Sequence, residues 1–113
     1  MPFWVYIMSN KHWDVFYTGV TNDIKARTAE HKQGRGGYFT SKYNCHCLVY
    51  YEQHEYIVDA IEREKKLKRW KRKWKLELIR KQNPGMRDLS QGGIERMMFD
   101  EIPGQHILGH RLF

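Results

Sequence analysis

Two short segments near the start of the chain, residues 3–8 (FWVYIM) and 15–20 (VFYTGV), are rich in aromatic and β-branched side chains. Such residues favour strands, and the polar residues 9–14 between them are typical of a hairpin loop. A third segment of the same kind, residues 47–52 (CLVYYE), follows later. The sequence therefore predicts a small sheet of three strands, two of which are joined as a hairpin.

A first helix is predicted over about residues 23–33. Asn22 is a good N-cap at its start, and Gly34 provides a stop signal at its end. Residues 34–44 hold three glycines among polar and aromatic residues, so we expect them to form a loop.

A longer helical stretch is predicted over residues 56–82, which contain neither Gly nor Pro and end at Asn-Pro-Gly, residues 83–85. A break near Trp70 into two helices suits a small domain better than one long helix does. The predicted order, β-β-α-β-α-α, is of the α+β class, with a small three-stranded mixed or antiparallel sheet flanked by helices.

The basic charge of the chain is concentrated in one region. The 113 residues suffice for one domain, and 20 Lys and Arg against 13 Asp and Glu give a formal net charge of +7. Residues 63–81 contain 11 of the basic residues and only two acids. A local basic patch indicates an anionic partner, and we expect nucleic acid rather than a membrane surface.

Neither a secreted nor a membrane-spanning protein is expected. The longest uncharged apolar run near the start, residues 3–8, is far shorter than the roughly 20 residues of a membrane span. The spacing of Cys45 and Cys47 does not suit a disulfide between distant elements, and it is too narrow for a structural zinc site. The expected location is the cytoplasm.

Glu64 falls at an unusual place in the second helical stretch. On a helical wheel it lies within the apolar stripe of Ile57, Ala60, Ile61 and Leu67. A carboxylate on an inward face needs a cation or hydrogen-bond donors. Two interpretations are open: a buried ion pair with an arginine of the first helix, or a metal ligand or catalytic acid.

Polar and aromatic residues of the first helix and the hairpin form a second candidate group. Arg27 and His31 share one helical face, which is either a solvated basic face or a face turned to a cleft. Tyr6 and Tyr17 become neighbours if the strand register brings their faces together, although tyrosines in strands more often pack than catalyse. Gly19 inside a strand indicates close approach of another backbone or a ligand.

Residues 68–75 interleave Trp70 and Trp74 with six cations. This pattern suits phosphate contacts with stacking on bases or sugars, and its alternative is a solvated helix face with two core tryptophans. The predicted nucleic-acid-binding residues are Lys65, Lys68, Arg69, Lys71, Arg72, Lys73 and Lys75.

Together these residues resemble the GIY-YIG nuclease family, and most closely its small stand-alone bacterial single-domain branch. The two name motifs correspond to residues 4–6 (WVY) and 17–19 (YTG), where Trp, Val and Thr replace the family's usual residues but both tyrosines are kept. The resemblance extends over about residues 3–89. The further matching segments are 23–27, His31, 60–68, 83–84 and 87–89.

The resemblance implies a metal-dependent endonuclease that hydrolyses phosphodiester bonds in DNA or structured nucleic acid. It implies that Tyr6 and Tyr17 position or deprotonate the attacking water and that Arg27 stabilises the pentavalent phosphate. It further implies that His31 assists proton transfer and that Glu64 holds Mg²⁺ or Mn²⁺. Gly19 and Asn83 would support the site.

The resemblance divides the chain into a nuclease domain, residues 1–89, and a C-terminal tail, residues 90–113. The apolar tail packs either on the domain or on a second copy, in which case it forms a homodimer. DNA is the expected partner and DNA repair the expected setting. The alternative function is a catalytically weak nucleic-acid-binding module with the same fold.

Overall fold

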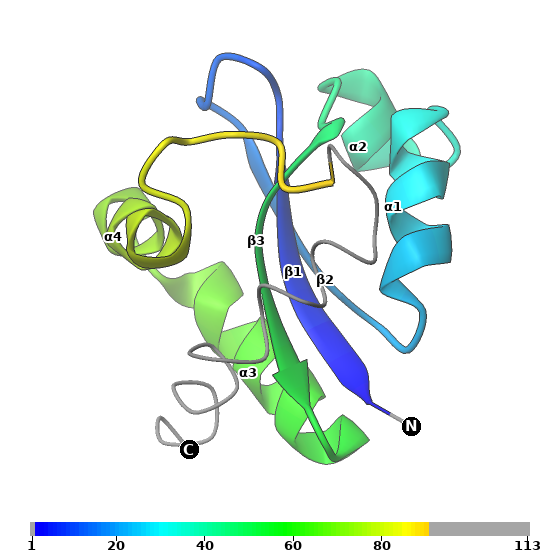
Figure 1. Ribbon diagram of the computed structural model, residues 1–113, viewed down its shortest axis with the longest axis vertical. Coiled ribbons are helices and arrows are strands. Elements are labelled where there is room, and N and C mark those ends of the chain that lie inside the picture. The colour runs from blue at the N-terminus through cyan, green and yellow to red at the C-terminus, as the bar shows by residue number, and fades with distance from the viewer. Residues whose placement is uncertain (1, 91–113) are drawn as a thin grey trace.

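The structure is a computed structural model that describes residues 2–90 of the chain. Three strands form an antiparallel sheet in the order β2-β1-β3, with β1 in the centre (Figure 1). This confirms the α+β class and the three predicted strands, and it makes the sheet antiparallel throughout. The strands are β1 (Phe3–Ser9), β2 (Phe16–Thr21) and β3 (Cys47–His54).

Helices cover both faces of the sheet, with α1 and α2 on one side and α3 and α4 on the other (Figure 1). The predicted break near Trp70 is confirmed, because Trp70 caps the end of α3 and α4 begins at Arg72. The helices are α1 (Ile24–Lys32), α2 (Tyr38–Lys42), α3 (Ile57–Arg69) and α4 (Arg72–Gln82).

Two local predictions around α1 are wrong. The N-cap is Asp23 rather than Asn22, because the Asp23 carboxylate accepts a hydrogen bond of 3.0 Å from the backbone N–H of Ala26. The expected loop over residues 34–44 contains the helix α2. A helix of five residues is too short to produce a periodic pattern in the sequence, and it forms only through the contacts described below.

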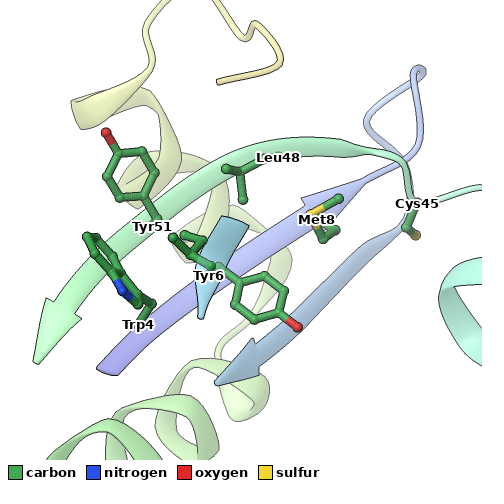
Figure 2. Close-up of a cluster of buried hydrophobic side chains, with 7 residues drawn as sticks. Trp4, Tyr6, Met8, Cys45, Leu48 and Tyr51 are labelled. Carbon is green, nitrogen blue, oxygen red and sulfur yellow. The ribbon is translucent and has the colours of Figure 1, made fainter. Parts of the chain in front are cut away.

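The core lies on the two faces of β1. Figure 2 shows the first cluster, in which Trp4, Tyr6 and Met8 of β1 lie beside Leu48 and Tyr51 of β3. Ile24 of α1 packs against the same cluster. On the other face, Val5 packs against Ala60 and Leu67 of α3. Even-numbered residues of β1 therefore face α1, and odd-numbered residues face α3 and α4.

The inward charged residue of α3 is Arg63, not Glu64. Ala60, Arg63 and Leu67 form the buried face of the helix, whereas Ile57 and Ile61 are exposed. The prediction that Glu64 lies in the middle of the inward stripe is therefore wrong. It failed because Glu52 of β3 meets Arg63 with a contact of 3.0 Å between Oε2 and Nε.

Glu52 is the centre of a buried polar cluster on the α3 side of the sheet. Besides the contact with Arg63, it accepts a hydrogen bond from the Tyr50 hydroxyl and lies 2.6 Å from Nε2 of His54. Burial alone would raise the pKa of Glu52, but the hydrogen bond from His54 and the charge of Arg63 outweigh burial and lower it. The cluster therefore keeps a negative charge inside the fold and fixes α3 against β3.

The segment after α4 runs back towards α1. Asp88 forms an ion pair with Lys32 of α1 and accepts a hydrogen bond from the backbone N–H of Leu48. Within residues 2–90, none of the helices has the length and apolar character needed to cross a bilayer. The predicted tail begins at residue 90, and its residues 91–113 lie outside the described residues.

Candidate active site

Tyr6 and Tyr17 are neighbours, as their alternation along the strands predicted. The register pairs Tyr6 with Gly19 and Met8 with Tyr17, so the two tyrosines are diagonal partners with ring centroids 6.3 Å apart. A β-carbon built on Gly19 would lie 2.5 Å from the Tyr6 hydroxyl. The group that approaches Gly19 closely is therefore the side chain of Tyr6 and not the backbone or ligand that was predicted, and Tyr6 needs a residue without a β-carbon opposite it.

Arg27 extends from α1 to the Tyr6 hydroxyl. Its Nε donates to that hydroxyl at 3.2 Å, Nη1 contacts Glu30 at 3.0 Å, and Nη2 donates to the carbonyl of Gly36 at 2.7 Å. Burial lowers the pKa of Arg27, but the bonds to Tyr6 and Glu30 outweigh burial and raise it. The guanidinium is held by three partners, is partly exposed, and carries its positive charge at every physiological pH.

His31 is fully buried between Tyr6 and α2. Its Nε2 lies 3.0 Å from the Tyr6 hydroxyl, and its Nδ1 lies 3.1 Å from Oγ1 of Thr40. Burial and the charge of Arg27 lower the pKa of His31 to about 4. The ring is therefore neutral at physiological pH.

The hydrogen-bond partners favour one tautomer of His31. Because Arg27 donates to the Tyr6 oxygen, the Tyr6 hydrogen is directed to Nε2 of His31. Nδ1 then carries the ring hydrogen and donates it to Thr40, whose hydroxyl contacts the carbonyl of Gly37 at 3.4 Å. Donors and acceptors thus follow one direction from Arg27 to α2, and Nε2 is the unprotonated nitrogen.

The pKa of Tyr6 is raised to about 12, chiefly by burial, even though the hydrogen bond from Arg27 acts in the opposite direction. The side chain is a neutral phenol at physiological pH. Tyr17 is half-buried and lies against the same group, with its ring centroid 5.4 Å from that of His31.

Three residues of this group were not among the predicted site residues. A β-carbon on Gly36 would lie 2.0 Å from Nδ1 of His31, so Gly36 leaves the space that the imidazole occupies. Thr40 bonds the same nitrogen, and Glu30 pairs with Arg27. The spacing of Arg27 and Glu30, three residues apart on a helix, is a signal that could have revealed their ion pair.

Glu64 comes from α3 and is not bonded to this group. Its carboxylate lies 2.8 Å from Nζ of Lys68, and its side chain is 15% exposed. Among residues 2–90, no hydrogen bond or ion pair joins Glu64 to Tyr6, Tyr17 or Arg27. The alternative of an ion pair with an arginine of the first helix is therefore wrong.

Asn83 is hydrogen-bonded to β3 and to the segment that follows α4. Its amide donates to the carbonyls of Val49 and Arg87, at 3.2 and 2.7 Å, and its Oδ1 accepts from the N–H of Arg87. These bonds fix the chain after α4 against β3.

The predicted nucleic-acid-binding residues differ in how available they are. Arg72 donates to the carbonyls of Trp13 and Asp14, and its guanidinium lies 5.0 Å from the ring of Phe16, so the hairpin loop occupies it. Lys75 is half-buried, and burial lowers its pKa. The others are exposed: Lys65, Lys68, Arg69, Lys71 and Lys73.

The two tryptophans between these cations have different environments. Trp70 packs against the cluster of Val5 and Leu67, whereas Trp74 is 48% exposed. Their rings meet edge to face with centroids 6.2 Å apart. The interpretation with both tryptophans in the core therefore holds for Trp70 only.

Comparison with known proteins identifies two groups of relatives. A model of the GIY-YIG catalytic domain matches residues 2–77. UPF0213 proteins of Staphylococcus aureus strains Mu3 and COL are each 38% identical over 64 residues, which are 57% of this chain and 78% of the relative. The solution NMR structure of the UPF0213 protein BH0048 from Bacillus halodurans is 24% identical with a TM-score of 0.45, and the match covers 91% of this chain and 98% of that one.

Proposed function

Because the chain belongs to the GIY-YIG catalytic-domain family, a family of nucleases, we propose that it is a metal-dependent endonuclease that hydrolyses phosphodiester bonds. The proposed substrate is DNA or structured nucleic acid, and the proposed domain comprises residues 1–89. The observation that carries the proposal is the directed hydrogen-bond chain from Arg27 through Tyr6 to His31, beside Tyr17.

Arg27 is proposed to stabilise the negative charge that develops on the phosphate oxygens during hydrolysis. Its guanidinium is already oriented by Tyr6, Glu30 and Gly36, so no reorganisation is needed when the charge appears. Its partial exposure leaves room for an anion. Bonds of this kind typically contribute about 10²–10³-fold to the rate.

Tyr6 and His31 are proposed to act together on protons. Tyr6 is a neutral phenol with a pKa of about 12, so we assign it the role of positioning rather than that of a free base. His31 is neutral and presents Nε2 to the Tyr6 hydroxyl, so this nitrogen can accept a proton that Tyr6 passes on. Tyr17, half-buried beside both, is proposed to position the attacking water.

Glu64 is the proposed metal ligand. Mg²⁺ is commonly bound by one or two carboxylates together with waters and substrate phosphates. Residues 2–90 contain no group of three or more His, Cys, Asp or Glu side chains placed to hold a metal. Glu64 is partly exposed and pairs with Lys68, so its carboxylate could supply the one protein ligand that such an ion needs. Such an ion, Mg²⁺ or Mn²⁺, would stabilise charge on the phosphate and leaving oxygens.

The test is cleavage of labelled single-stranded, duplex and branched DNA and of an RNA, with Mg²⁺, Mn²⁺ or EDTA. We expect metal-dependent cleavage that is lost in Glu64→Gln while nucleic-acid binding and the circular dichroism spectrum are retained. Glu62→Gln, an exposed neighbour on the same helix, serves as the control and should cleave normally. Tight binding without cleavage under any metal would instead support the binding-module alternative.

A further inference from the structure

Three aromatic side chains in and next to α2 project from the protein beside the candidate active site. Tyr38 is 79% exposed, and Phe39 and Tyr43 are each 40% exposed. We call these three residues the aromatic platform. The Phe39 ring lies 4.8 Å from that of Tyr43 and 5.9 Å from that of Tyr17. Aromatic rings therefore continue from the buried site to the surface without a gap.

The aromatic platform is held in a fixed position by the site itself. An isolated helix of five residues has almost no stability of its own in water. Here Thr40 of α2 forms a hydrogen bond with His31, and the carbonyl of Gly36, just before α2, accepts a hydrogen bond from Arg27. The two side chains that hold α2 in place, His31 and Arg27, are therefore proposed catalytic residues. A ligand on the aromatic platform would therefore lie at a defined place relative to Arg27 and His31.

The surroundings of the aromatic platform are positively charged. No Asp or Glu occurs between Glu30 and Glu52, whereas Arg35 and Lys42 do, and the third cation of this segment, Lys32, is paired with Asp88. The ammonium group of Lys42 lies 5.5 Å from the ring of Tyr38 and 5.4 Å from that of Tyr43. Clustered exposed aromatic rings mark interaction surfaces, and rings combined with cations are the chemistry that binds single-stranded nucleic acid.

We propose that the aromatic platform stacks unpaired nucleobases next to the phosphate that Arg27 contacts, so that the substrate is single-stranded nucleic acid or a single-stranded segment. Bases inside a duplex are stacked on their own neighbours and do not present a free face to the rings. The position of the phosphate rests on the proposed function, whereas base stacking is measurable without cleavage.

The experiment measures binding in EDTA with Glu64→Gln, so that no strand is cut. The probes are a single-stranded DNA and a single-stranded RNA that carry the fluorescent base 2-aminopurine, and a blunt duplex of the same sequence. We expect single strands to bind more tightly than the duplex and to quench the fluorescence through stacking. The single strand that binds with the higher affinity, DNA or RNA, identifies which nucleic acid is the ligand.

The decisive variants change the two most peripheral rings. Tyr38→Ala with Tyr43→Ala should weaken single-strand binding by about tenfold for each ring and abolish the quenching. Tyr38→Phe with Tyr43→Phe keeps both rings and should bind like the parent. Tyr56→Ala removes an aromatic ring that is 63% exposed outside the aromatic platform, and it should have no effect.

Equal binding of duplex and single strand, with no quenching and no effect of the alanine pair, would overturn the proposal. Sedimentation gives a second contrary outcome: a dimer that the alanine pair dissociates, with unchanged nucleic-acid binding, would assign the rings to a second copy. Quenched binding by a protein that never cleaves would support the aromatic platform and reject the nuclease. Cleavage that is unchanged when Tyr38 and Tyr43 are replaced by alanine would support the nuclease and reject the aromatic platform.

Discussion

The Tyr6 hydroxyl lies so close to Gly19 that a β-carbon at that position would be 2.5 Å from it. The two residues are direct partners across β1 and β2, so the pairing of the strands sets the contact. Because the same hydroxyl accepts from Arg27 and donates to His31, the empty space at Gly19 determines where both groups lie.

Gly19→Ala should therefore displace Tyr6 and disturb its hydrogen bonds. Forcing one carbon into a packed site typically costs about 1–3 kcal/mol, so we expect this loss in urea unfolding together with a marked loss of cleavage. Gly85→Ala is the control, since its β-carbon would meet Arg87 at an ordinary 3.5 Å. Normal cleavage by Gly19→Ala would contradict the role given to this contact.

Thr40→Val should release Nδ1 of His31 from its partner while keeping the shape of the side chain. A buried donor left without its acceptor costs about 1–3 kcal/mol, which thermal or urea unfolding detects. Nitrogen-15 NMR reports the tautomer directly: the wild type should show hydrogen on Nδ1, and Thr40→Val should show a mixture. An unchanged tautomer in the variant would mean that Tyr6 alone fixes the ring.

His31 should make the fold sensitive to acid. Its pKa in the folded state is about 4, below the ordinary 6.5, so the neutral buried ring contributes fully above pH 6.5 and this contribution is lost as the pH falls towards 4. The loss is on the order of 3 kcal/mol. Urea unfolding of His31→Gln should show a flatter pH dependence in this window, whereas the exposed His12→Gln should follow the wild type. If the unfolding free energies of all three proteins depended on pH in the same way, the lowered pKa of His31 would be contradicted.

The two ion pairs of α3 should differ greatly in strength. Glu52→Gln removes the carboxylate that faces the buried Arg63 and should cost about 3–5 kcal/mol in urea unfolding. Lys68→Met removes the more exposed pair with Glu64 and should cost at most about 0.5 kcal/mol. Comparable losses in the two variants would show that Glu52 is not the group that fixes α3.

Neutralising exposed cations of the predicted binding surface should weaken nucleic-acid binding and reduce its salt dependence. Lys71→Gln with Lys73→Gln, measured in the Glu64→Gln background, should lower the slope of log affinity against log salt by about 0.7–0.9 for each phosphate that the protein no longer neutralises. Arg80→Gln with Lys81→Gln makes the same change in charge outside the predicted set and should alter the slope less. Equal effects of both pairs would favour a diffuse charge effect over a defined surface.

The sheet and the long helices could be predicted because their signals are local. Aromatic and β-branched residues mark the strands, and the absence of Gly and Pro over residues 56–82 marks the helical stretch. The break near Trp70 was expected because two helices suit a small domain better than one long helix. The helix α2 could not be predicted, because it depends on contacts from Thr40 and Gly36 to side chains of α1. Such tertiary contacts have no signature in the sequence of α2 itself.

The candidate site was predictable only where its signal was local, within one hairpin. Alternation along the hairpin brought Tyr6 and Tyr17 together, and the register confirmed it. A helical wheel, however, considers only one helix. It placed Glu64 inward, whereas the structure turns Arg63 inward because Glu52 of β3 compensates its charge. Partners from other elements decide which charge is buried.

The hydrogen bond between His31 and Thr40 connects a titrating group to the helix that carries the exposed rings. Coupling between two binding equilibria is reciprocal, so a proton on His31 and a base on the aromatic platform affect each other by the same factor. If acid weakens the attachment of α2, then a bound strand must lower the proton affinity of His31 in equal measure. Substrate binding would thus extend the pH range in which the imidazole stays neutral to more acid values.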